Sequence, residues 1–242
     1  MFDVQGFPKK KQAGKVLVRS LGRVLYGHIF RKMKEFTLQR DASTPDEIWI
    51  VEHEPVFTLG QAAVRSHILD AHGIPVIETD RGGEVTYHGP GQAVVYLMFD
   101  LRRRYGKLHV RELVSRIESA VISVLETVGI TGERRAGAPG VYIPAESSYG
   151  THQRSKIAAL GLKIRSNGCM YHGLALNVAM NLEPFRWIDP CGYKGLAVTD
   201  MKSLGFCGGL KEVQLELLHS LSRELDFKVM FVGDEEVNDA GQ

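Results

Sequence analysis

The chain has 242 residues and a formal net charge of +2 at neutral pH, far below the charge of most nucleic-acid-binding proteins. Its hydrophobic fraction of 44% and charged fraction of 24% are those of an ordinary globular protein with a sizeable core. No apolar run approaches the roughly 18 residues that a membrane-spanning helix needs. We therefore expect a protein that binds neither nucleic acid nor membrane.

The cysteines Cys169, Cys191 and Cys207 are too few, and odd in number, for a disulfide scaffold in a chain of this length. They indicate a reducing compartment, so we expect a cytoplasmic protein whose thiols remain free to react. The first residues carry basic side chains with no apolar stretch behind them, which excludes a secretory signal. Residues 1–14 are therefore expected to form a flexible basic leader.

The spacing of apolar residues predicts helices and strands along the rest of the chain. Helices are predicted from Tyr26 to Met33, from Val110 to Leu125 with an end near Gly129, and from Leu217 to Leu225. Residues 81–101 are predicted to form a glycine turn, a strand, a second turn and a buried strand. Further strands are predicted at residues 47–53, 74–80, 138–144, 155–165, 172–181 and 227–232.

The predicted strands cluster around few helices, which favours an α/β fold with a mixed β-sheet flanked by helices. We expect one domain over residues 15–232, because no linker is long enough to force a boundary. Residues 144–154 are polar and contain glycine, which is typical of a surface insertion between two strands. Residues 233–242 are expected to be a loose acidic tail.

The stretch "RGGEVTYHGPGQ", from Arg81, has four glycines but matches neither a dinucleotide-binding fingerprint nor a phosphate-binding P-loop. Glycines beside a strand let a ligand lie against bare backbone. On a strand over residues 84–88, Thr86 and His88 share a face with Glu84. A tight hairpin with an incidental histidine fits the same residues equally well.

The stretch "SKIAALGLKIR" places a lysine in line with apolar residues. Alternation puts Lys156 on the same face as Ala158, Leu160 and Leu162. Because burying an ammonium group without a partner is costly, Lys156 either reaches solvent from the strand end or serves an acceptor in a site. Reaching solvent is the commoner outcome.

Cys169 and His172 are close in sequence, but on a regular strand they point to opposite faces. No second Cys/His pair lies near them, so we expect no metal site. His172, followed by Gly173, fits a substrate contact better than a metal ligand.

The stretch "WIDPCGYKG" presents Cys191 at a bend between a proline and a glycine. A free thiol with a pKa of about 8.5 is only a few per cent thiolate at neutral pH, and a nearby ammonium group increases that fraction. Lys156 would be a suitable activator if its side chain reached the bend. The residues thus indicate a candidate Cys–Lys pair beside an apolar, glycine-lined cleft.

Together these stretches resemble the lipoyl(octanoyl) transferase family. The resemblance runs from about Leu21 to Leu204. It rests on the motifs "EHEPVFTLG", "RGGEVTYHGPGQ", "PGVYI", "KIAALGLKIR", "HGLALNV" and "IDPCGY". It implies the biotin/lipoate ligase-like catalytic fold.

The resemblance also implies roles for individual residues. Cys191 would carry the acyl group as a thioester, and Lys156 would lower the pKa of that thiol. The implied substrate contacts are Arg81, Gly82, Gly83, Glu84, Val85, Thr86, Tyr87, His88, Ala158, Ala159, Leu160, His172, Gly173 and Leu174.

The implied reaction transfers an octanoyl group from octanoyl-acyl carrier protein to a lysine of a lipoyl domain. The acceptors would be the E2 subunits of 2-oxoacid dehydrogenases and the glycine cleavage H protein, and the transfer would be the first step of endogenous protein lipoylation. Neither ATP nor a cofactor is implied, and we expect a monomer. An ATP-dependent lipoate or biotin protein ligase and a non-catalytic acyl-binding protein remain alternatives. Arg65 and the run Arg102–Arg104 are candidate contacts for acidic partners, although a solvated basic surface is commoner.

Overall fold

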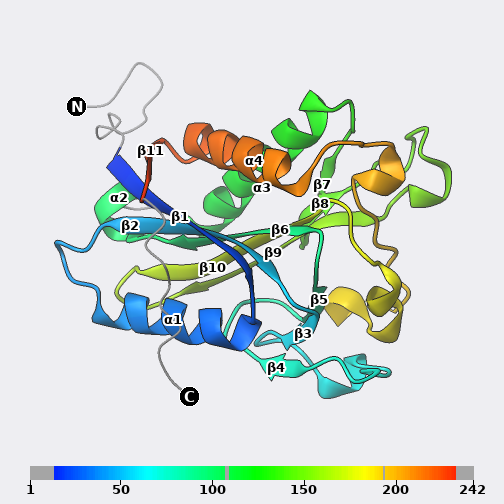
Figure 1. Cartoon of the computed structure of the whole chain (residues 1–242), viewed down its shortest axis with the longest axis horizontal. Helices are drawn as coiled ribbons and strands as arrows, with labels where there is room; N and C mark the ends of the chain where they lie inside the picture. The colour runs from blue at the N-terminus through cyan, green and yellow to red at the C-terminus, as the bar shows by residue number, and fades with distance from the viewer. Residues whose placement is uncertain (1–13, 107–108, 193, 233–242) are drawn as a thin grey trace.

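The computed structural model describes residues 14–106, 109–192 and 194–232. These residues form an eight-stranded sheet and a smaller three-stranded sheet (Figure 1). The strands of the large sheet, in spatial order, are β11 (Phe227–Phe231), β1 (Gly14–Val24), β2 (Asp46–His53), β6 (Gln92–Met98), β10 (Met170–Asn177), β9 (Lys156–Ile164), β8 (Ala138–Tyr142) and β7 (Glu133–Arg135). β1 is parallel to β11 and β2, and the remaining neighbours are antiparallel.

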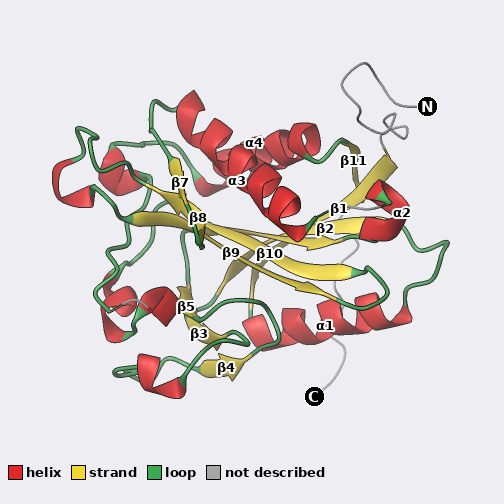
Figure 2. Cartoon of the chain, turned by 180° about the vertical axis from the view of Figure 1, so that it is seen from behind, coloured by secondary structure: helices red, strands yellow, loops and turns green. Residues whose placement is uncertain are grey.

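Helices cover both faces of this sheet. α3 (Val110–Thr127) and α4 (Leu210–Glu224) lie on one face, and α1 (Tyr26–Gln39) lies on the other (Figures 1 and 2). The short helix α2 (Leu101–Tyr105) follows β6. The predicted mixed sheet flanked by helices is therefore confirmed.

The strand β6 shows why the sheet needs both helix layers. All of its residues are buried, since alternate side chains enter two different cores. Val95 and Leu97 pack in the cluster that contains Leu113 of α3. Val94 and Tyr96 pack in the cluster that contains Met33 of α1, so β6 is a continuous apolar run after Gln92 rather than an alternating one.

The smaller sheet stands beside the large one and carries the glycine-rich stretch. Its strands are β4 (Val76–Glu78), β3 (Val56–Leu59) and β5 (Val85–His88). Phe57 and Tyr87 pack there against Phe185 and Ile188. In this arrangement β5 contacts the 3₁₀ turn Pro190–Gly192.

The sequence patterns missed three strands: β1, β3 and β7. β1 begins at Gly14, the last residue of the expected leader, and its register shifts between Ser20 and Arg23. That irregularity, with Gly22 at a positive φ of 64°, breaks the alternation that would identify a strand. Residues 1–13 of the expected leader and the expected acidic tail, 233–242, lie outside the described residues.

The insertion 144–154 connects β8 to β9, as expected. Its base is closed by a hydrogen bond from the Ile143 N–H to the Ser155 carbonyl, with an N to O distance of 2.9 Å. The ring of His152 also lies 3.0 Å from the hydroxyl of Thr199. Within residues 14–106, 109–192 and 194–232, no helix has the length and apolar character needed to cross a bilayer.

Candidate active site

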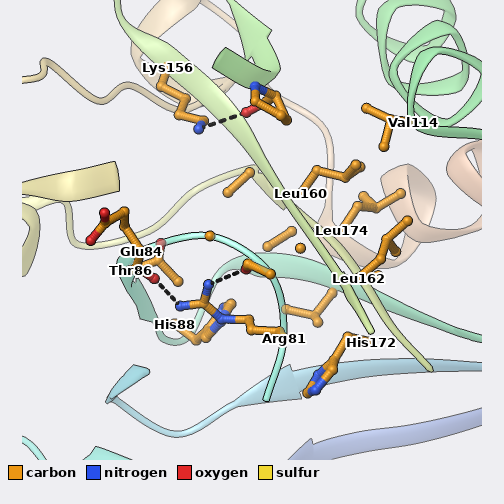
Figure 3. A pocket seen from close by; sticks show the side chains of 18 of the residues that line it. Arg81, Glu84, Thr86, His88, Val114, Lys156, Leu160, Leu162, His172 and Leu174 are labelled. Atoms are coloured by element: carbon orange, nitrogen blue, oxygen red, sulfur yellow. Dashed lines mark hydrogen bonds between the residues drawn. The ribbon is translucent and has the colours of Figure 1, made fainter. Parts of the chain in front are cut away.

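A cavity of about 460 Å³ lies where β5 and the loop 81–84 meet β9 and β10 (Figure 3). Lys156 lines it, as do all of the expected substrate contacts except Tyr87 and Ala158. The chain segments that carry them are far apart in the sequence, and the two sheets bring them together.

The side chains of these two exceptions are buried in the surrounding cores. Tyr87 points into the core of the small sheet, against Phe57 and Phe185. Ala158 is buried in the core beneath α3, and the next residue, Ala159, faces the cavity instead.

Small residues form the part of the cavity wall that faces the loop 81–84. Ala159 lies opposite Ala175, and Gly161 lies opposite Gly173, in the antiparallel register of β9 and β10. A Cβ atom on Gly161 would lie 2.9 Å from the carbonyl oxygen of Gly82, so only glycine lets the loop approach this closely. Ala175 and Gly161 line the cavity, yet sequence reasoning missed them. The sequence signal that could have identified them is the small residue at every second position, 159 and 161 in one strand and 173 and 175 in the other.

Arg81 shapes the loop from within. Its buried guanidinium donates hydrogen bonds to the carbonyl oxygens of Thr58, Gly82 and Glu84, at 2.7, 3.0 and 2.7 Å. These bonds tie the loop to β3. In addition, the Gly82 N–H donates to the Leu162 carbonyl at 2.9 Å, which closes the loop onto β9.

Lys156 stands at the first position of β9 and is only 6% exposed. Of the two outcomes that the sequence left open for Lys156, this burial excludes the one in which the side chain reaches solvent. Its Nζ atom donates to the Pro139 carbonyl at 2.9 Å and lies 5.3 Å from the ring centre of Tyr142. Residues 197–199 fix its backbone, because the Lys156 N–H donates to Ala197 and its carbonyl accepts from Thr199.

The backbone of Cys191 lies in the 3₁₀ turn Pro190–Gly192. The turn is held by a bond from the Asp189 N–H to the His67 carbonyl at 2.8 Å, and Gly192 adopts a φ of 72°. Only residues 193–196 separate this turn in sequence from the segment that fixes Lys156. The Cys191 side chain is outside the described part of the structure, and its pairing with Lys156 stays a prediction.

The other cysteines lie elsewhere. Cys169 directly precedes β10. Its neighbour Met170 pairs with Ile164, the last residue of β9, so Cys169 lies at the opposite end of β9 from Lys156. It is buried, and burial raises the pKa of its thiol. Cys207 is exposed, in the segment before α4.

A chain of buried polar side chains fixes the tautomer of His88. The Asn177 amide nitrogen must donate to the Thr199 carbonyl, at 2.9 Å, so its oxygen accepts from Gln92. The Gln92 oxygen then faces Nδ1 of His88 at 2.7 Å. Nδ1 therefore carries the proton, and Nε2 is left as an acceptor. Burial lowers the pKa of His88 to about 3, which keeps the ring neutral. Sequence reasoning missed Gln92 and Asn177.

His172 lies at the far end of the cavity from Lys156 (Figure 3). It pairs with Leu162 of β9. Leu162 lies six positions after Lys156, a separation of roughly 20 Å along the strand. Its Nε2 atom lies 3.0 Å from Asp80, whose carboxylate also accepts from the Tyr171 hydroxyl. Burial alone would raise the pKa of Asp80, but these hydrogen bonds lower it to about 2. Among the described residues, no cluster of three or more His, Cys, Asp or Glu side chains could hold a metal ion.

The basic run Arg102–Arg104 requires a correction. Arg103 and Arg104 both bind Asp46, at 2.8 Å, and Arg40 binds the same carboxylate at 2.7 Å. The Arg104 side chain is only 7% exposed. Arg104 therefore holds α2 against β2, and it is neither part of a solvated basic surface nor open to a partner.

Comparison with known proteins gives the following matches. Residues 29–219 match the family model described as the lipoyl protein ligase A/B catalytic domain. The octanoyltransferase of Herminiimonas arsenicoxydans is 57% identical over 211 residues, which cover 86% of this chain and 96% of that protein. The octanoyltransferase of Thiobacillus denitrificans is 50% identical over 211 residues, which cover 87% of this chain and 91% of that protein.

Solved structures match at much lower identity. A bipartite lipoate protein ligase of Thermoplasma acidophilum aligns with a TM-score of 0.67 at 15% identity, over 93% of this chain and 89% of that one. A lipoate-protein ligase A bound with ATP aligns with a TM-score of 0.63 at 15% identity, over 92% of this chain and 90% of that one. These two likenesses establish the fold that the resemblance implied.

Proposed function

The chain belongs to the lipoyl protein ligase A/B catalytic domain family, and we propose that it transfers an octanoyl group to lysine side chains of lipoyl domains. The observation that carries this proposal is its 57% identity with a curated octanoyltransferase over nearly the whole of that protein. The cavity supports it, because it joins an apolar, small-residue wall to a buried lysine at one end.

The first step forms an acyl-enzyme. The Cys191 thiolate attacks the thioester carbonyl of octanoyl-acyl carrier protein, a C–S bond to Cys191 forms, and the carrier's own thiol leaves. The Lys156 ammonium favours the thiolate by electrostatic attraction. A decrease of about two units in the thiol pKa corresponds to about 2.7 kcal/mol.

The second step forms the amide. The neutral amine of an acceptor lysine attacks the Cys191 thioester, the new C–N bond forms, and the electron pair of the C–S bond leaves on sulfur. Lys156 relays the proton from nitrogen to sulfur. A thioester is an activated acyl group, so the step needs no ATP and no cofactor.

The setting of this chemistry follows from the same proposal. Residues 15–232 would act as one catalytic domain, present as a monomer. The acyl carrier protein would be the donor, and E2 subunits of 2-oxoacid dehydrogenases and the glycine cleavage H protein would be the acceptors, in the first step of endogenous lipoylation. A cytoplasmic location, expected from the cysteine content, stays a prediction.

An ATP-dependent lipoate or biotin protein ligase is the second candidate, because an ATP-bound lipoate-protein ligase has the same fold. The test incubates the enzyme with octanoyl-acyl carrier protein and a lipoyl domain without ATP, and measures the mass of the lipoyl domain. An octanoyltransferase modifies the domain. An unmodified domain that becomes octanoylated only with free octanoate and ATP would identify a ligase, and no modification in either case would fit a non-catalytic acyl-binding protein.

A further inference from the structure

Glu84 places a carboxylate at the end of the cavity where the turn Pro190–Gly192 packs. Its side chain lines the cavity and is 25% exposed. A Cβ atom on Gly192 would lie 3.1 Å from the carboxyl carbon of Glu84, so the carboxylate directly neighbours the turn. In Figure 3, Glu84 and Lys156 lie towards the same side of the pocket, away from His172.

The position of this carboxylate is fixed relative to the Cys191 backbone. Oε2 of Glu84 lies 3.2 Å from Nδ1 of His67, so the ring N–H donates a hydrogen bond to the carboxylate oxygen. The carbonyl of His67 accepts from Asp189, and Ile68 forms a β-bridge with Ile188. The segment that carries His67 is thus paired with the residues that immediately precede the turn.

A carboxylate here gives no help to the first step of the proposed reaction. It opposes the formation of a thiolate at Cys191, since like charges disfavour each other. The second step is different, because its nucleophile reaches the enzyme as a lysine ammonium group. A lysine has three N–H donors and a compact charge that a carboxylate binds well.

We propose, on the basis of the function above, that Glu84 binds the amino group of the acceptor lysine at the mouth of the cavity. The bound ammonium group releases one proton to solvent before it reacts. When the resulting neutral amine forms the C–N bond, its nitrogen gains a positive charge, and Glu84 stabilises that charge. The C–S bond then breaks with its electron pair on the Cys191 sulfur. The nitrogen proton passes through Lys156 to that sulfur, so the products are an amide and a thiol.

The test separates the two steps in Glu84→Gln, which removes the charge but keeps an oxygen that accepts from His67. Glu78→Gln is the matched control, because Glu78 lies in the same small sheet and its side chain is 79% exposed. Intact mass measures formation of the octanoyl adduct from octanoyl-acyl carrier protein. Single-turnover assays then measure loss of the adduct to a lipoyl domain and to hydroxylamine, a small amine that is neutral at pH 7.

Glu84→Gln should form the adduct at least as fast as the wild type, because the charge that opposes the thiolate is gone, and it should react normally with hydroxylamine. Its transfer to the lipoyl domain should fall about 10- to 100-fold, the effect of losing a charged hydrogen bond. Unchanged transfer would overturn the proposal. Loss of adduct formation would also overturn it, because Glu84 would then only support the turn. Failure of the wild type to form any adduct would instead overturn the proposed function, and this inference with it.

Discussion

The Nζ atom of Lys156 lies 2.9 Å from the carbonyl oxygen of Pro139 and donates a hydrogen bond to it. A neutral acceptor fixes the direction of the ammonium group without cancelling its charge. That charge can therefore act on a thiolate nearby. Lys156 is buried, so water screens this interaction less than it would at the surface.

Lys156→Ala should raise the pKa of the Cys191 thiol, because the neighbouring positive charge is lost. The expected increase is about one to two units, and octanoyl transfer should be almost abolished. The rate of iodoacetamide alkylation at Cys191, followed against pH by peptide mass, measures the shift. Lys163→Ala on the same strand is the control, and a midpoint that does not move in Lys156→Ala would contradict the pairing.

Cys191→Ala should abolish transfer, whereas Cys169→Ala should keep most of it. Cys169 lies at the other end of β9 from Lys156, and burial raises the pKa of its thiol, which makes it a poor nucleophile. Single-turnover transfer to a lipoyl domain distinguishes the two variants. The assignment fails if their activities are reversed.

Gly161→Val should narrow the cavity by displacing the loop 81–84. Even the first side-chain carbon would lie 2.9 Å from the Gly82 carbonyl oxygen, and such overpacking costs about 1–3 kcal/mol. We expect a lower urea midpoint and a larger loss of acylation with an octanoyl donor than with a butyryl donor. Gly209→Ala is the control, because a Cβ there meets nothing within 4 Å. Equal losses with both donors would show that this wall does not contact the distal acyl chain.

The unfolding free energy should fall as the pH decreases below neutrality. Burial lowers the pKa of His53 to about 4 and that of His88 to about 3, against about 6.5 in an unfolded chain. Between these pH values the unfolded state binds protons that the folded state does not. Each histidine therefore lowers the unfolding free energy by about 1.4 kcal/mol for each unit by which the pH decreases.

His53→Gln should therefore reduce the slope of unfolding free energy against pH by that amount between about pH 6 and pH 4.5. Urea unfolding at several pH values measures the slope. His28→Gln, on the exposed side of α1, is the control. An identical slope in His53→Gln and the wild type would refute burial of a neutral ring at this position.

Much of the fold follows from local pattern, and its exceptions have physical causes. The strong periodicity of α3 and the continuous apolar run of β6 identify those elements directly. β1 escapes detection because Gly22 and a register shift interrupt its alternation. β1 is placed in the sheet by parallel pairing with β2 and with β11. The residues of β11 lie far from β1 in the sequence, so local pattern does not reveal this pairing.

The site is predictable in its motifs but not in its finer geometry. Sequence motifs identify the loop 81–84 and Lys156, yet they predict a substrate contact at Ala158 and at Ala159 alike. Which alanine faces the cavity depends on how β9 pairs with β10. The orientation of His88 depends on Gln92 and Asn177, whose hydrogen bonds form only in the folded chain.

The proposed chemistry requires that Cys191 carries the acyl group. The most direct measurement exposes the enzyme to octanoyl-acyl carrier protein without ATP or acceptor, and then locates the adduct by peptide mapping under mildly acidic conditions. We expect one octanoyl group, on the peptide that contains Cys191, and its loss on addition of a lipoyl domain. An adduct on Cys169 or Cys207, or an unmodified enzyme that still octanoylates the lipoyl domain, would contradict it.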